Sequence, residues 1–163
     1  METEGIIKNI HSQWLIAKEQ RRLRCEASNM DDVARKLAEC KMFKGTETLE
    51  ELAQLFLSPQ GLEFCLAANF PSLATLRIFK KYDTRRLGFY IDAGTIRLKN
   101  PGKVVLIGRT NATIECDTCE AHTVVTMHGA TATVVASGWA VVRTEAGIAS
   151  GIIKRTSANA IIL

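Results

Sequence analysis

The chain has 163 residues, an apolar fraction of 47% and a formal net charge of +4. This length suits one domain or two small ones, and the ordinary apolar content excludes a disordered chain. No stretch approaches the roughly 18 consecutive apolar residues of a membrane span, and five cysteines, an odd number, favour reduced thiols. We therefore expect no membrane association and a cytoplasmic location.

The first half of the chain has the apolar spacing of helices. This spacing predicts one helix over residues 3–24 and a second over 30–42. Thr48-Leu-Glu-Glu51 matches a capping box, which predicts the start of a third helix. Ser58-Pro59 is typical of an N-cap followed by proline at the first helical position, and predicts a fourth. A fifth helix is expected from Ser72 to Tyr82.

The fifth predicted helix ends in a cluster of cations. A short helix and a turn precede it, so it occupies the place of the recognition helix in a helix-turn-helix. The simpler interpretation is a basic helix end that leads into a linker. A nucleic-acid-binding regulator that uses the segment Ser72–Arg86 is therefore an alternative function. Its candidate binding residues are Arg77, Lys80, Lys81, Arg85 and Arg86.

The pattern changes between Tyr82 and Gly88, where helical spacing disappears. The residues that follow are rich in Val, Ile and Thr, which indicates strands. Residues 1–86 hold 14 Lys/Arg and 12 Asp/Glu, and residues 87–163 hold 7 and 5, so each half carries about +2. A nucleic-acid-binding protein more often has a concentrated basic patch. We predict a helical domain over 1–86 and a β-repeat domain over 87–163.

The β half repeats at short intervals. Its predicted strand centres lie 8–10 residues apart, and Gly129, Gly138 and Gly147 are spaced by nine. This repetition favours a β-solenoid in which two nine-residue units form a coil of about 18 residues. An antiparallel sandwich or barrel is the alternative, because its strands recur at similar intervals. The predicted fold class is α+β, with a helical N-terminal half followed by a β-solenoid-like half.

The units that begin at Gly129 and Gly138 are rich in Thr, Val and Ala. They resemble the repeat tails of uncharacterised bacterial and phage-type proteins, in which such units stack behind a helical head. The resemblance covers residues 88–163 and implies the same division into head and tail. It implies no activity.

One group of residues has the chemistry of a metal site. Cys116-Asp-Thr-Cys119 is a CxxC motif, and His122 and His128 follow it. Thiolates and imidazoles are good zinc ligands, and a tetrahedral site needs four of them. The alternation of side chains along strands would scatter these four over two faces. We therefore predict reduced cysteines, no bound metal and no cofactor.

Catalytic motifs are missing from the sequence. It contains no GxSxG, P-loop, GxGxxG or HExxH. We therefore predict a non-enzymatic structural or protein-interaction protein whose β-repeat is a scaffold and assembly surface. A carbohydrate-binding or carbohydrate-active protein is a further alternative, with Trp139 as a stacking platform. An aligned row of exposed acidic and aromatic side chains along the repeat would favour that alternative.

Apolar doublets such as Val104-Val105 recur along the β half. Adjacent strand residues point to opposite faces, so each doublet sends one side chain outward. Stacked doublets would form an exposed apolar stripe, which monomers rarely leave uncovered. The apolar segment Asn159–Leu163 also offers a strand that can pair with another chain. We predict a homo-oligomer with the interface residues Val124, Val134, Val142, Ile161 and Leu163.

Overall fold

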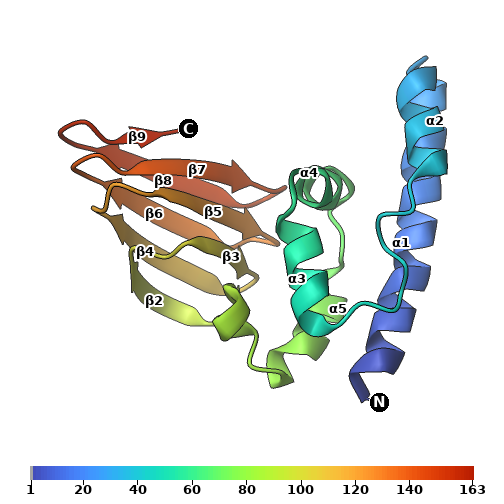
Figure 1. The fold of residues 1–163 in the computed structure, drawn as a ribbon, viewed down its shortest axis with the longest axis horizontal. Coiled ribbons are helices and arrows are strands. Elements are labelled where there is room, and N and C mark those ends of the chain that lie inside the picture. Colours follow the sequence, from blue (N-terminus) through green and yellow to red (C-terminus); the bar gives the residue numbers. More distant parts are fainter. Residues whose placement is uncertain (1) are drawn as a thin grey trace. The chain divides into compact units, whose positions relative to one another are not determined.

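The structure is a computed structural model that describes residues 2–163. The chain forms two compact units, of which the first ends at Pro71 and the second runs from Ser72 to Leu163. The regular elements of the first unit are helices, and the second unit combines short helices with two β-sheets (Figure 1). We call them the helical unit and the solenoid unit.

Residues 2–71 contain four helices as predicted, although the second ends at Glu39 and not at residue 42. The two helix starts predicted from capping residues are confirmed. The Thr48 hydroxyl accepts a hydrogen bond from the Glu51 amide, and the Glu51 carboxylate accepts one from the Thr48 amide, which completes the capping box. Ser58 caps the next helix, with Pro59 at its first position. The helices are α1 (Glu2–Ala27), α2 (Asp31–Glu39), α3 (Leu49–Leu57) and α4 (Pro59–Ala68).

An aromatic cluster lies in the core of the helical unit. Ile7, Ile10 and Trp14 share one face of α1 and are buried. The Trp14 ring lies 5.9 Å from that of Phe43 and 6.3 Å from that of Phe64. The core of this small unit therefore depends on one tryptophan that contacts rings from two other segments.

The solenoid unit begins with a short helix, α5 (Leu73–Ile78). Two 3₁₀ turns follow it, η1 (Phe79–Lys81) and η2 (Thr84–Leu87). The first strand starts at Phe89, so the change from helix to strand follows Tyr82 as predicted. The two units meet at Pro71, earlier in the chain than the predicted domain boundary at residue 86. The reason is that α5 is bonded to the first strands through Asp92.

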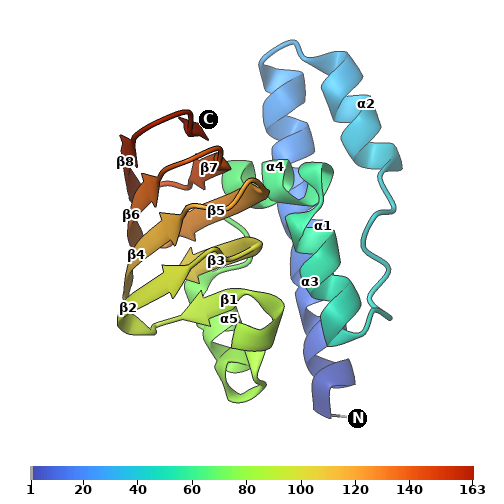
Figure 2. The ribbon, with the colours of Figure 1, turned by 60° about the vertical axis from the view of Figure 1, so that its left-hand side comes forward.

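Nine strands follow, and they alternate between two parallel sheets. Sheet A has the order β1-β3-β5-β7-β9 and sheet B the order β2-β4-β6-β8 (Figure 2). Because every pairing is parallel, the half is a β-solenoid as predicted, and the antiparallel alternative is wrong. The strands are β1 (Phe89–Ile91), β2 (Gly94–Lys99), β3 (Lys103–Ile107), β4 (Thr110–Cys116), β5 (Ala121–Met127), β6 (Thr131–Ala136), β7 (Val141–Ala146), β8 (Gly151–Thr156) and β9 (Ile161–Ile162).

The coil length differs from the predicted 18 residues. Val104 pairs with Val124, and Ile114 pairs with Val134, so one coil takes 20 residues. The first coil is shorter, since Phe89 pairs with Val105. The nine-residue glycine spacing marks successive turns between the sheets, and strand plus turn takes about ten residues on average. We number the coils by their strands: β1–β2 is coil 1, β3–β4 coil 2, β5–β6 coil 3 and β7–β8 coil 4.

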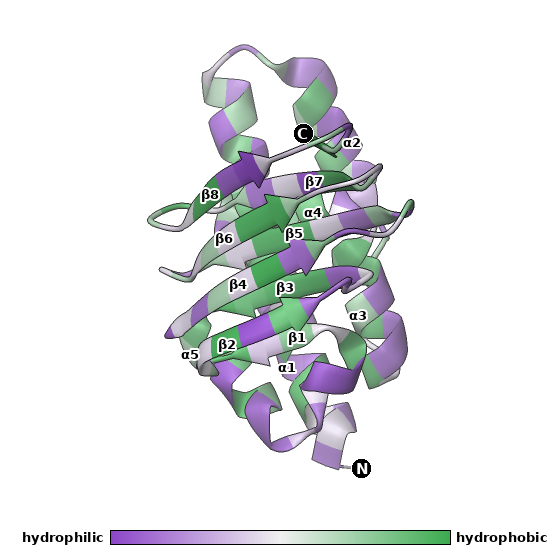
Figure 3. Ribbon diagram, turned by 90° about the vertical axis from the view of Figure 1, so that its left-hand side faces the viewer, coloured by the Kyte–Doolittle hydropathy of each residue, from purple (hydrophilic) through white to green (hydrophobic). Residues whose placement is uncertain are grey.

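The core of the solenoid consists of rows of side chains stacked from coil to coil. One row in sheet B places Leu98, Ile114 and Val134 in register, and the last two are fully buried. The next member of the row, in β8, is Lys154, which is exposed. The end of β8 is hydrophilic where the matching part of β6 is hydrophobic (Figure 3). A lysine at a core position ends the apolar row, and on an edge strand it also opposes pairing with another chain.

Candidate functional site

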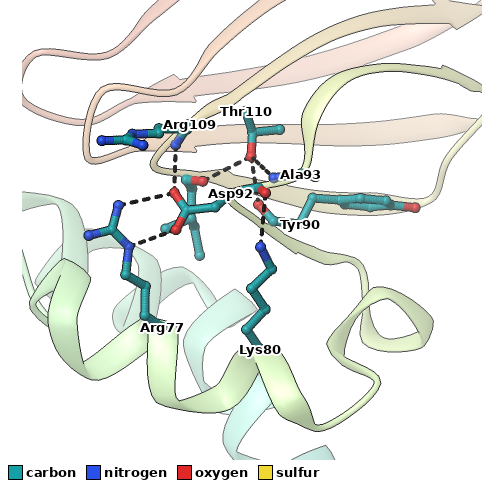
Figure 4. Close-up of polar contacts among 8 residues, drawn as sticks. Arg77, Lys80, Tyr90, Asp92, Ala93, Arg109 and Thr110 are labelled. Carbon is teal, nitrogen blue, oxygen red and sulfur yellow. Dashed lines mark hydrogen bonds and ion pairs between the residues drawn. The ribbon is translucent and has the colours of Figure 1, made fainter.

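Asp92 joins α5 to the first two coils (Figure 4). Its carboxylate accepts from Arg77, with Nε to Oδ2 at 2.6 Å and Nη2 to Oδ1 at 3.3 Å. The Arg109 amide donates to the same Oδ1 at 2.8 Å, and Lys80 Nζ donates to the Asp92 carbonyl at 3.1 Å. Asp92 is in the left-handed conformation, with φ +46°, which directs its carboxylate to both partners. Two cationic side chains and one backbone amide therefore bond one aspartate.

Thr110 supports this turn from the other side. Its hydroxyl oxygen accepts from the Ala93 amide at 3.0 Å, and the hydroxyl lies 2.9 Å from the Ile107 carbonyl to which it donates. Thr110 is buried, so these bonds replace those it would make with water. The turn after β1 is thus fixed to the turn after β3, and Arg77 has a rigid partner.

The Arg77 guanidinium, and next the Arg109 amide, lower the pKa of Asp92 to about 2. A carboxyl group whose pKa is lower in the folded state stabilises the fold above its unfolded pKa of about 4, and the contribution is lost as the pH falls from about 4 to 2. We expect Asp92→Asn to reduce the free energy of unfolding by about 1–2 kcal/mol at pH 7, since solvent screens the half-exposed Arg77. Urea titrations should show that this loss of free energy disappears near pH 2. The control Asp83→Asn changes an exposed residue and should alter the free energy of unfolding little at either pH. An equal loss at pH 2 and pH 7 would contradict the role of the charge.

The predicted nucleic-acid-binding residues lie around this site, but not on a recognition helix. The helix predicted from Ser72 to Tyr82 is only six residues of α-helix, and Phe79–Lys81 tightens into a 3₁₀ turn. Lys81 Nζ lies over the Tyr82 ring at 5.1 Å, and the Arg85 guanidinium lies over the Tyr90 ring at 5.8 Å. The helix-turn-helix interpretation therefore has no helix long enough to enter a major groove.

The four candidate zinc ligands are not brought together. Cys116 points into the solenoid core, and burial and the nearby Asp117 raise its thiol pKa to about 11, whereas Cys119 is exposed in a turn. His122 is buried with Nδ1 2.6 Å from the Pro101 carbonyl, so it is a hydrogen-bonded core histidine. His128 follows the far end of β5, about 20 Å along the strand from His122. In residues 2–163 no group of three or more metal-ligating side chains converges.

The predicted oligomer interface needs correction for three of its five residues. Val124, Val134 and Val142 are the inward members of their doublets and lie fully buried in the core. They therefore present no surface to a partner. Ile161 and Leu163 are exposed. The sequence cannot say which member of an apolar doublet faces inward, because both are equally apolar.

The outer face of sheet B gives no support to the carbohydrate alternative. Its residues form threonine rows, such as Thr113 beside Thr133, and ion pairs between coils. Arg97 pairs with Glu115 at 3.5 Å, and Lys99 pairs with Asp117 at 3.3 Å. None of the residues of β2, β4, β6 and β8 is aromatic. An aligned row of acidic and aromatic side chains is therefore missing from these four strands.

Sequence reasoning did not connect Asp92 with Arg109. They are 17 residues apart and come together only through the coil register. Comparison with protein-family models, with curated proteins and with solved structures finds no match for this chain. In the part of the chain that the structure describes, the helices are too short or too polar to cross a bilayer.

Proposed function

We propose that the protein is a non-enzymatic structural protein that assembles with copies of itself through its solenoid unit. The observation that carries this proposal is a group of exposed apolar side chains on the last coils. The exposed fraction is 66% for Trp139, 39% for Val141, 52% for Ile161 and 65% for Leu163. We call these four residues the apolar patch. The five free cysteines suit a reducing compartment, and we propose the cytoplasm as its location.

The strand register places the two central residues of the apolar patch side by side. Val141 pairs with Ile161 on the neighbouring strand, and paired residues in a sheet are about 4.8 Å apart. Trp139 precedes Val141 by two residues, and Leu163 follows Ile161 by two. Residues two apart in a strand point to the same face. Val141 and Ile161 therefore lie on the outer surface of sheet A, whereas Val142 and Ile162 point inward. Leu163 continues beside β7 through backbone hydrogen bonds with Val142 and Thr144, and Trp139 lies in the turn that leads into β7.

A second copy of the chain is the partner that this surface fits. Arg143 and Glu145 border the patch on β7 and bond each other at 3.0 Å, so the border carries one charge of each sign. Under two-fold symmetry the same patch is used twice, and Arg143 of one copy can face Glu145 of the other. Pairing through the free edge of β8 is opposed by Lys154. We therefore expect association face to face, with aromatic and aliphatic contacts at its centre.

Light scattering after size-exclusion chromatography tests this proposal. Between about 1 and 100 µM we expect wild-type protein to have a mass above that of the 17.9 kDa monomer. Val141→Lys should weaken self-association at least tenfold, because it places a charge in the centre of the apolar patch. The matched control is Ile153→Lys, which adds the same charge at a residue 59% exposed on sheet B and should leave the mass unchanged.

Two results would count against self-assembly. One is a monomeric mass for wild-type protein throughout the concentration range. The other is equal dissociation of the Val141 and Ile153 variants, since that would place the interface elsewhere or show a general effect of charge. Circular dichroism of both variants checks that the solenoid remains folded.

A further inference from the structure

The two units differ in charge once they are divided at Pro71. Residues 1–71 contain 9 Lys/Arg and 11 Asp/Glu, whereas residues 72–163 contain 12 and 6. The solenoid unit is itself uneven, because residues 72–109 hold nine cations and two acidic residues, and residues 110–163 hold three and four. The basic charge of the protein is thus concentrated in α5, the 3₁₀ turns and the first strands.

Three of these cations belong to residues bonded to Asp92 in the turn after β1, and three more lie in the adjoining 3₁₀ turns η1 and η2. Asp92 bonds Arg77 and the Arg109 backbone, and its carbonyl bonds Lys80. Figure 4 shows the Arg109 guanidinium on the same side of this turn as that of Arg77. All six side chains belong to exposed residues. We call this group the basic end, and it comprises Arg77, Lys80, Lys81, Arg85, Arg86 and Arg109.

Residues 72–109 contain nine cations and two carboxylates, Asp83 and Asp92, so this segment has a net positive charge. The Asp92 carboxylate bonds Arg77, and Lys80 bonds a backbone carbonyl, which carries no formal charge. Like charges held close together destabilise a fold, and a bound polyanion removes that repulsion. The Lys81 ammonium and the Arg85 guanidinium lie over tyrosine rings, which help to position them. The arrangement therefore has a surplus of positive charge on rigid elements.

We infer that the basic end binds nucleic acid through its phosphate backbone. Four of its six cations are arginines, whose planar guanidinium can donate two parallel hydrogen bonds to one phosphate. Phosphate contacts alone give sequence-independent binding, which needs no recognition helix. This fits an α5 too short to enter a groove. Five residues of the basic end lie in α5, η1 and η2, and Arg109 lies in coil 2. The apolar patch lies on the last coils, so the basic end does not depend on self-assembly.

Fluorescence anisotropy with a labelled 20-base-pair DNA duplex tests the inference. Neutralising four to six phosphates predicts that affinity falls by about 10²–10³ between 50 and 200 mM salt. The triple variant Lys81→Gln, Arg85→Gln, Arg109→Gln should bind at least tenfold more weakly at 50 mM salt. The slope of the logarithm of its binding constant against the logarithm of salt concentration should be smaller in magnitude by about three. None of these substitutions removes a contact to the Asp92 carboxylate, so the fold should persist.

The matched control removes the same charge from other places. Arg24, Lys36 and Arg155 are exposed and lie outside the basic end. Changing all three to Gln should leave the affinity within about threefold of wild type, because local phosphate contacts rather than net charge dominate binding. Equal losses in both triple variants would overturn the inference, as would no binding of the duplex at 50 mM salt. Tight binding to vesicles with 30% phosphatidylserine, together with weak duplex binding, would show that the surface recognises a membrane instead.

Discussion

Replacing Val134 by lysine is expected to reduce the free energy of unfolding by about 4 kcal/mol or more, enough to unfold much of the solenoid unit. Val134 is fully buried in sheet B between Ile114 and Lys154. A lysine there must lose its hydration or expel its neighbours. Its folded-state pKa would lie below its unfolded value, so the variant should become more stable as the pH rises towards 10. Urea titrations at pH 7 and pH 10 measure both effects.

Lys154 provides the matched comparison, because it occupies the same row one coil later. Lys154→Val should leave the free energy of unfolding unchanged or raise it slightly. Lys154 is exposed, and a valine in its place would continue the apolar row. The same change removes the charge that guards the free edge of β8, so light scattering should show new concentration-dependent aggregates. Equal effects of Val134→Lys and Lys154→Val on the free energy of unfolding would contradict an apolar row that ends between these two residues.

Gly88→Ala is expected to have the second large effect. Gly88 has φ +86°, and a Cβ atom there would lie 2.3 Å from the Lys103 carbonyl oxygen, which is backbone and cannot move aside. Gly129 has nearly the same φ, +88°, but its Cβ would have open space around it. We expect Gly129→Ala to cost about 1–2 kcal/mol through backbone conformation alone, and Gly88→Ala to cost about 2 kcal/mol more.

The difference between these two variants isolates the close approach of two backbone segments. Gly88 also accepts a hydrogen bond from the Val105 amide, so a shift there would separate coil 1 from coil 2. Thermal unfolding followed by circular dichroism gives the comparison. Equal melting temperatures for the two variants would show that the backbone between η2 and β1 can shift without loss of stability.

Much of the architecture could be predicted because the local signals were strong. Thr48 and Ser58 mark helix starts through side-chain bonds to nearby amides, which depend on adjacent residues only. The parallel solenoid follows from repetition. The coil length could not be obtained in the same way, since the glycines at 129 and 138 mark turns and do not fix how many residues each coil needs.

The candidate sites were harder to predict because they depend on register. The five cations from Arg77 to Arg86 could be identified from the sequence, but Arg109 joins them only because the turn after β3 lies beside the turn after β1. The concentration of charge was hidden by a domain boundary placed at residue 86, which divided the basic end from the strands that it adjoins. With the boundary at Pro71 the same residues give one acidic and one basic unit.

The apolar doublets show a different limit of prediction from sequence. The inward or outward direction of each side chain depends on where a strand begins relative to its turn, and a shift of one residue exchanges the two faces. The sequence predicted that one member of each pair would be exposed. Val141 and Ile161 have that position, and their neighbours Val142 and Ile162 point into the core. The prediction is wrong for Val105 and Val125, which are fully buried like the other members of their doublets.

The constant 20-residue register means that the length of the solenoid unit can change in steps of one whole coil. Coil 3 pairs with the coils on both sides at the same offset, so an inserted copy of residues 121–140 would continue rows such as Val124 and Val134. Each added coil would lengthen the stack by about 4.8 Å. The distance between the basic end and the apolar patch can therefore change by whole coils while the composition of both surfaces stays the same.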